Sequence, residues 1–190
     1  MKPRMEDDER ELFAAFLRAA KSYAEFGTGG STVLASSLVD GPVFALDSSS
    51  EWLDSVRVAC AKCGKASEPV LLHVNIGPIS EWGAPLGVTH RHLWPDYAKS
   101  MWHIPGAAKA DLYLIDGRFR VSCAVEALLR CRSDAVILIH DFAERTRYHI
   151  IKEVAREIAF ARSLSAFVRR SDFDGSRALE ILELKRFEPD

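Results

Sequence analysis

An acidic residue just before a glycine-rich loop is the first feature of this chain that could bind a ligand. Residues 23–32 read Tyr-Ala-Glu-Phe-Gly-Thr-Gly-Gly-Ser-Thr, so a short apolar run with Glu25 leads into Gly27, Gly29 and Gly30. Glycines let a backbone turn tightly and approach a ligand closely, and amides at the start of the following helix face that ligand. Glu25 would repel a phosphate there but attract a cationic amino group.

A second acid follows at a spacing suited to a ribose. Asp47 ends the apolar run Val-Phe-Ala-Leu-Asp and lies 20 residues after Gly27. An acid at this spacing can accept hydrogen bonds from both ribose hydroxyls. Two alternatives stay open: Asp47 caps the helix that begins near Ser48, and the glycine loop is a tight turn without a ligand.

Polar residues also end the later apolar runs. Asn75 and Ile76 end the third run, Asp116 ends the fourth, and His140 and Asp141 end the fifth. In open α/β sheets, ligands bind outside the carboxyl ends of the strands, where the strand order reverses. We therefore expect these residues to form one site together with the glycine loop.

His140 and four nearby arginines suggest roles inside that site. His140 could act as a general base near neutral pH, or it could be a buried histidine hydrogen-bonded beside the sheet. Arginines at a pocket mouth can bind a carboxylate or phosphate bidentately, or they can be solvated residues of helix starts. Under the first reading the substrate is anionic. The arginines are Arg118, Arg120, Arg145 and Arg147.

Alternating apolar patterns predict the elements that position these residues. Helical spacing predicts helices over residues 6–20, 31–38, 51–63, 119–129 and 144–161, with Gly64 ending the third and a further short helix near 96–101. Apolar runs predict strands over residues 23–26, 43–47, 69–76, 111–116, 135–141, 166–169 and 178–184. This order indicates an α/β fold: a doubly wound, mostly parallel sheet with helices on both faces and an antiparallel C-terminal strand. We expect one domain over residues 1–190.

Residues 77–109 break the alternation and carry Trp82, Trp94 and Trp102 with three histidines. Loops this long in a compact domain are usually functional. We expect a lid or a substrate-binding wall, with a packing or oligomer surface as the alternative. His90 and His92 share one side of an extended chain, which leaves a metal there conceivable.

Composition limits the partners. The chain is 48% apolar and 27% charged with a net charge of −2, so charge gives no case for nucleic acid or an anionic membrane. The charged N-terminus is not a signal peptide, and no run is long enough to span a membrane. We expect a cytoplasmic protein with a small-molecule substrate, and a homo-oligomer stays open. The lone Cys60-Ala-Lys-Cys63 motif is interpreted as packing thiols.

The motifs together resemble those of the class I S-adenosylmethionine-dependent methyltransferases, in particular a little-characterised bacterial group of methyltransferase-like proteins. The resemblance covers about residues 10–185, and its most specific segments begin at Glu25, Val43, Asp111 and Val136. It implies a Rossmann-like, seven-stranded sheet. The nicotinamide-binding pattern GxGxxG fits less well, because Thr32 stands where its third glycine should be.

The resemblance assigns roles to the site residues. It implies that Gly27, Thr28 and Gly29 line the methionine part of S-adenosylmethionine beside Glu25, and that Asp47 holds the ribose. It also implies that residues after the second, third and fourth strands, Ser48, Asn75, Ile76 and Asp116, lie near the rest of the cofactor. Many relatives have an acid where Asn75 stands.

Some methyltransferases of this fold hold Mg²⁺ with acids after the fourth and fifth strands. Asp116 and Asp141 match those positions, although Phe142 follows where asparagine is usual. The alternative is that both acids are helix caps or cofactor-pocket groups. Together with His140 they are the predicted catalytic residues.

The sequence therefore predicts methyl transfer from S-adenosylmethionine to a small, anionic acceptor. A cofactor-binding module that has lost the reaction is the main alternative, since no obvious catalytic base is present. A nicotinamide-dependent oxidoreductase is the second.

Overall fold

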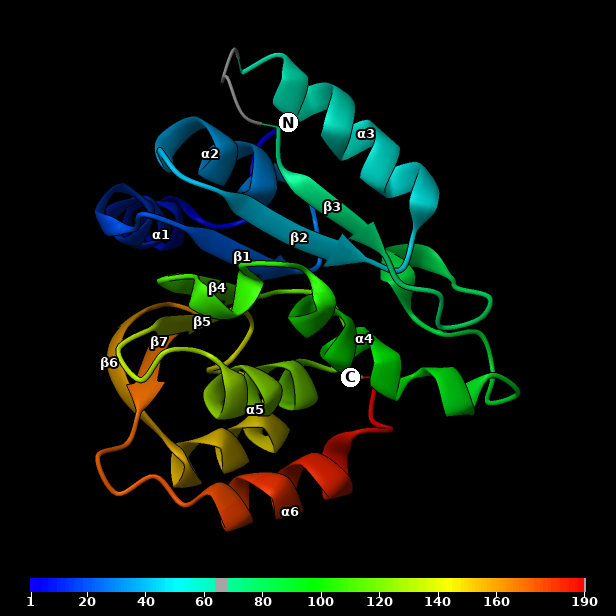
Figure 1. The fold of residues 1–190 in the computed structure, drawn as a ribbon, viewed down its shortest axis with the longest axis vertical. Coiled ribbons are helices and arrows are strands. Elements are labelled where there is room, and N and C mark those ends of the chain that lie inside the picture. The colour runs from blue at the N-terminus through cyan, green and yellow to red at the C-terminus, as the bar shows by residue number, and fades with distance from the viewer. Residues whose placement is uncertain (64–67, 190) are drawn as a thin grey trace.

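A seven-stranded sheet forms the centre of the molecule and carries helices on both faces (Figure 1). The computed structural model describes residues 1–63 and 68–189. The strands lie in the order β3-β2-β1-β4-β5-β7-β6 and are β1 (Tyr23–Phe26), β2 (Val43–Asp47), β3 (Val70–His73), β4 (Leu112–Ile115), β5 (Val136–Ile139), β6 (Ala155–Ala161) and β7 (Leu164–Arg169). Strands β1 to β5 pair in parallel, whereas β7 runs antiparallel to β5 and β6. The predicted α/β class and sheet type are therefore confirmed.

The helices form two layers. Figure 1 shows α1, α2 and α3 on one side of the sheet and α4, α5 and α6 on the other. The helices are α1 (Asp7–Ala19), α2 (Gly30–Leu38), α3 (Ser50–Ala61), α4 (Pro95–Lys99), α5 (Arg120–Arg130) and α6 (Gly175–Lys185). Gly64, the predicted stop of the third helix, lies outside the described residues.

The central strand β1 shows how a strand buried on both faces serves two cores. Successive side chains of a strand point to opposite faces. Tyr23 packs with Phe13 and Leu17 of α1 on one face, while Phe26 packs against Trp102 on the other. Glu25, two residues after Tyr23, therefore points to the α1/α2 side, and this direction decides its role in the site.

The prediction of a helix over residues 144–161 is wrong. Thr146–Glu153 is a 3₁₀ helix (η5), and the edge strand β6 follows it directly. Ile150, Ile151, Val154 and Ile158 have helical spacing, but exposed and partly buried side chains alternate from Arg156 onward. The turn to β7 passes through Arg162, whose φ of 47° is unusual for a residue other than glycine, so no turn signal marked the hairpin.

The prediction of a closing strand over residues 178–184 is also wrong, because these residues belong to α6. Asp174 caps this helix by accepting hydrogen bonds from the amides of Ser176 (2.9 Å) and Arg177 (3.1 Å). Ala178 and Ile181, three residues apart, are fully buried. The cap and this spacing override the strand propensity of the apolar run, and the closing hairpin is β6–β7 instead.

Residues 94–109 form a packed wall, whereas none of residues 77–93 is buried. After the short 3₁₀ turns η1 (Glu81–Gly83) and η2 (Arg91–Leu93) come α4, η3 (Ser100–His103) and η4 (Ala107–Lys109). Trp94, Tyr97 and Met101 are buried in the main core, so this part covers the sheet. Trp82, in the turn η1, is instead 64% exposed.

Candidate functional site

The glycine loop joins the carboxyl end of β1 to the start of α2. Gly27 has a φ of 92°, and its amide donates to the carbonyl oxygen of Leu46 in β2 at 2.9 Å. Its backbone also contacts that of Gly117: a Cβ atom on Gly27 would lie 2.5 Å from the Cα of Gly117. The loops after β1 and β4 therefore approach each other closely only because both residues are glycine.

Glu25 holds the loop from beneath. Its fully buried carboxylate accepts hydrogen bonds from the hydroxyls of Ser31 and Thr32 (2.7 Å for Thr32) in the first turn of α2. Burial raises the pKa of Glu25 to about 8, although both hydroxyls favour the charged form. The carboxyl group orders the loop, and its predicted attraction for a cationic ligand stays a prediction.

Asp47 faces the loop across the ends of β1 and β2. One carboxylate oxygen accepts hydrogen bonds from the amide and hydroxyl of Thr28 (2.9 and 3.1 Å), and the other accepts from the amide of Ser49 (3.0 Å). Burial raises the pKa of Asp47, and these hydrogen bonds act in the opposite direction. The structure thus brings Asp47 to the glycine loop, and its ribose-binding role stays a prediction.

The turn at Trp82 lies over this edge of the sheet. The carbonyl oxygen of Trp82 accepts from Nε of Arg118 (2.9 Å), and that of Gly83 accepts from the hydroxyl of Ser48 (3.4 Å). Arg4 places its guanidinium 4.2 Å from the centre of the Trp82 ring. Because Ser48 follows β2 and Arg118 follows β4, the turn crosses above β1. Residues 81–83 and Arg4 therefore lie near the carboxyl end of β1, while Trp52 contacts the glycine loop itself by donating from Nε1 to the carbonyl oxygen of Thr28 (2.7 Å).

Ser48, Asn75 and Ile76 take three different positions. Ser48 is buried next to Asp47. Asn75 lies beyond the end of β3 and forms a local turn, accepting a hydrogen bond from the Gly77 amide at 2.9 Å. Ile76 is buried in the main core. These roles toward an adenine stay predictions.

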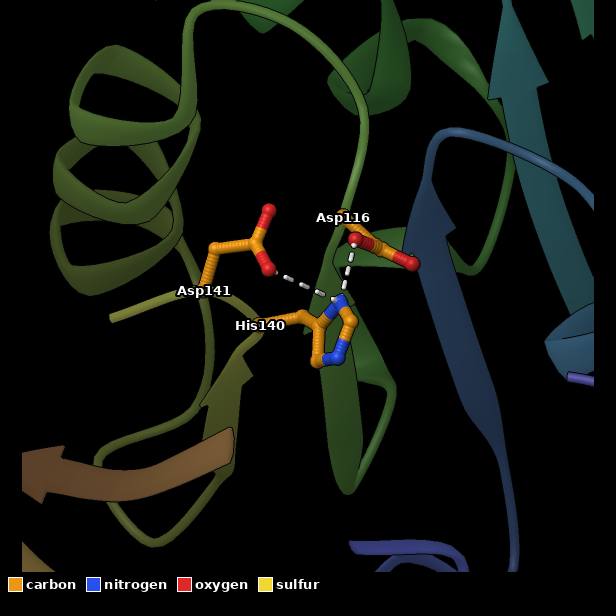
Figure 2. A group of neighbouring side chains, drawn as sticks. All are labelled: Asp116, His140 and Asp141. Atoms are coloured by element: carbon orange, nitrogen blue, oxygen red, sulfur yellow. Dashed lines mark hydrogen bonds and ion pairs between the residues drawn. The ribbon is translucent and has the colours of Figure 1, made fainter. Parts of the chain in front are cut away.

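His140 is bound at both ring nitrogens by carboxylates from different elements. Figure 2 shows its ring between Asp116 and Asp141, with dashed lines to both. Its Nδ1 lies 3.0 Å from a carboxylate oxygen of Asp116 and 3.7 Å from one of Asp141. Its Nε2 lies 3.5 Å from a carboxylate oxygen of Glu9 in α1. Burial disfavours the charged form, but Asp116, Asp141 and Glu9 together raise the pKa of His140. His140 therefore keeps its proton more readily than a free histidine.

Glu9 is the site residue that the sequence analysis missed. It is 3% exposed and accepts hydrogen bonds from the amide and hydroxyl of Ser163 (2.9 and 2.6 Å) and the amide of Glu6 (2.9 Å). Burial would raise its pKa, but these bonds and His140 lower the pKa to about 2. Glu9 lies four residues before Phe13 and eight before Leu17, so the sequence alone places it on the buried face of α1. This spacing could have identified it.

Asp116, His140 and Asp141 form the only group of three potential metal ligands found in the described parts of the chain, with ligand atoms within 4.8 Å of one another. Both acids already have charged partners, however. Arg120 contacts both acids, at 2.9 Å for Asp141 and 3.3 Å for Asp116, and Arg145 contacts Asp141 at 2.8 Å. Burial would raise the pKa of Asp141, but Arg120, His140 and Arg145 lower it. The group does not fit Mg²⁺ in this arrangement.

The predicted anion-binding arginines are likewise engaged by the protein. Arg120 and Arg145 bind the acids, Arg118 binds the Trp82 carbonyl, and Arg147 lies over the ring of Tyr148 at 5.5 Å. A cavity of about 550 Å³ lies beside His140, and the charged residues that line it are Arg4, Glu6, Glu9, His140, Asp141, Glu144 and Arg162. Nε of Arg162 is itself 2.8 Å from the carboxylate of Asp8. A second cavity, about 560 Å³, includes Asn75. Neither of these two is lined by Gly27, Thr28 or Asp47.

The strand order, the antiparallel β7 and the strand-end site define a Rossmann-like fold of the class I S-adenosylmethionine-dependent methyltransferases. The predicted resemblance is thereby confirmed. The chain is similar to a methyltransferase-like protein from Silicibacter pomeroyi with 27% sequence identity, over 99% of this chain and 98% of that protein, with a TM-score of 0.88.

More distant structures share the fold alone. An O-methyltransferase from Bacillus cereus in complex with SAH has 15% identity and a TM-score of 0.60 over 88% of this chain and 84% of its own. The O-methyltransferase TomG from Streptomyces achromogenes in complex with SAM has 18% identity and a TM-score of 0.57, over 83% and 76%. No family model matches the chain, and no curated protein matches it. Within residues 1–63 and 68–189, no helix is long and apolar enough to cross a bilayer.

Proposed function

We propose that this protein transfers a methyl group from S-adenosylmethionine to a small acceptor. The observation that supports this best is the contact between Asp47 and the glycine loop, which puts a carboxylate beside a tight turn at the switch point of the sheet. Fold alone does not imply function, so the proposal depends on this contact.

Residues at the carboxyl ends of the strands would each bind a different part of the cofactor. Gly27, Thr28 and Gly29 would line the methionine portion, and Asp47 would exchange its contact with Thr28 for the ribose hydroxyls. Ser48, with Asn75 and Ile76, would flank the adenine. When bound, the cofactor would supply an electrophilic methyl group on its sulfonium sulfur, open to in-line attack by a nucleophile of the acceptor with S-adenosylhomocysteine as the leaving group.

The acceptor would occupy the cavity beside His140, Asp116 and Asp141. In-line displacement needs mainly positioning of the nucleophile, so proximity and orientation carry the catalysis. His140 lies between Asp116 (3.0 Å) and Glu9 (3.5 Å) and would orient both carboxylates beside the cavity. Arg4 on the same wall would pair with an anionic group of the acceptor, whereas Arg162 is already paired with Asp8.

Calorimetry with S-adenosylhomocysteine tests the cofactor site. Asp47→Asn keeps the shape of the side chain but replaces an accepting oxygen by a donor, so we expect binding to weaken by about tenfold or more. Asp40→Asn, at an exposed position before β2, serves as the matched control and should bind like the wild type. No binding to wild-type protein at millimolar ligand would exclude the proposal. Binding without methyl transfer to a broad acceptor panel would favour a binding module.

The turn at Trp82, with Arg4 against it, predicts an effect on the rate at which the cofactor product associates. Arg4→Ala removes the cation over Trp82, an exposed contact of about 0.5–1 kcal/mol, so we expect S-adenosylhomocysteine to associate about two- to fivefold faster. Stopped-flow tryptophan fluorescence measures this rate. Arg18→Ala, on the exposed side of α1, is the control. An unchanged association rate for Arg4→Ala would mean that the turn does not restrict entry.

A further inference from the structure

Arg120 is the most buried cation at the carboxyl ends of the strands. Only 6% of its side chain is exposed, although it opens α5 directly beside the cavity. Its Nε donates to the carbonyl oxygen of Gly117 (3.0 Å), and its two terminal nitrogens donate to those of His140 (2.6 Å) and Asp116 (3.0 Å). One side chain therefore ties together the loops that follow β4 and β5.

The same guanidinium contacts both predicted metal ligands. One terminal nitrogen lies 2.9 Å from the carboxylate of Asp141 and the other 3.3 Å from that of Asp116. Asp141 has a φ of 57°, a left-handed conformation that aims its carboxylate at this point. A divalent ion between the two acids would have to displace the buried guanidinium of Arg120. The three carbonyl oxygens that Arg120 contacts would then lose their hydrogen-bond donor.

The two acids of this cluster already have cationic partners. The carboxylate of Asp141 lies 2.9 Å from Arg120 and 2.8 Å from Arg145, and that of Asp116 lies 3.3 Å from Arg120. A divalent ion would add two positive charges beside these guanidinium groups. Lysine could not replace Arg120 equivalently, because the contacts need donors on three nitrogens of a planar, rigid group.

We infer that Arg120 occupies the position that a divalent cation takes in metal-dependent members of this fold, and that it is a positioning residue for the loops carrying Asp116, His140 and Asp141. This inference rests on the proposed function in one respect: it takes the cluster of Asp116, His140 and Asp141 to be part of the methyl-transfer site. On that basis, the transfer needs no divalent ion, and EDTA leaves its rate unchanged.

Mn²⁺ titration followed by electron paramagnetic resonance tests this inference without any cofactor. Wild-type protein should leave the free Mn²⁺ signal unchanged at about 100 µM metal, because the cation position is filled. Arg120→Ala exposes three ligands within 4.8 Å of one another and should bind Mn²⁺ at least about tenfold more tightly than the wild type. Arg120→Lys retains a positive charge and should not gain this affinity.

Arg145→Ala is the matched control, because it removes a cation from Asp141 but leaves Arg120 in place. It should gain less than about twofold in Mn²⁺ affinity. Saturable Mn²⁺ binding by wild-type protein that Asp116→Asn abolishes would overturn the inference, as would a folded Arg120→Ala protein with no gain. If Arg120→Ala does not fold, the wild-type and Arg120→Lys titrations decide. Failure of S-adenosylhomocysteine to bind would refute the proposed function. The Mn²⁺ titrations would still test the role of Arg120, because they contain no cofactor.

Discussion

Gly27→Ala is expected to destabilise the protein by about 3 kcal/mol or more and to abolish binding of S-adenosylhomocysteine. Gly27 has a φ of 92°, which an alanine adopts only with strain, and the added Cβ would lie 2.5 Å from both the Cα and the nitrogen of Gly117. These are backbone atoms, so no side chain can move aside. The loops after β1 and β4 must separate, and the edge that Asp47 faces is lost.

Urea unfolding followed by circular dichroism measures the first effect, and calorimetry the second. Gly87→Ala separates the two sources of the cost, because Gly87 also has a positive φ (69°) but a Cβ there would meet nothing within 4 Å. That variant should lose only about 1 kcal/mol, the strain of the left-handed conformation. Equal destabilisation by the two substitutions would show that the contact between the loops contributes nothing.

The edge strand β3 is exposed or half-buried, but β1, β2, β4 and β5 are largely buried and could be predicted from sequence for that reason. Such strands appear as short apolar runs, as Val43–Asp47 does, and a turn or helix signal separates them. The C-terminal part could not be predicted in this way. The edge strand β6 exposes Ile158 and Phe160, and α6 exposes Leu179 and Leu184, so apolar residues there do not report burial.

Site residues that directly follow a strand could be predicted from sequence. Site residues on helices could not, because their place in the site depends on how the helices pack. Asp47, Asp116 and His140 follow strands, and the topology brings their ends to one edge of the sheet. The contacts of Glu9 and Arg120 come from helices that reach the same edge in space. Arg120 was read as a group for binding an anionic substrate, and no spacing rule indicated that the acids themselves would be its partners.

Glu9→Gln is expected to lower stability at pH 7 and to remove part of the acid sensitivity of the protein. The folded-state pKa of Glu9, about 2, lies below its ordinary value of 4.5. A depressed carboxyl pKa stabilises the folded state above pH 4.5, and that contribution is lost as the pH falls through 4.5 toward 2. The shift corresponds to at most about 3 kcal/mol, which solvent screening near the cavity reduces to about 1–2 kcal/mol.

His140 adds the opposite dependence. Its pKa is raised in the folded state, so its contribution is fully present below its ordinary value of 6.5 and is lost as the pH rises through the folded-state value. Glu9→Gln removes one of the carboxylates that raise it and should therefore also flatten the stability profile above pH 6.5. Free energies of unfolding in urea from pH 3 to pH 9 measure both arms, with Glu11→Gln on the exposed face of α1 as control. If Glu9→Gln and Glu11→Gln gave the same profile, Glu9 would not couple α1 to the histidine.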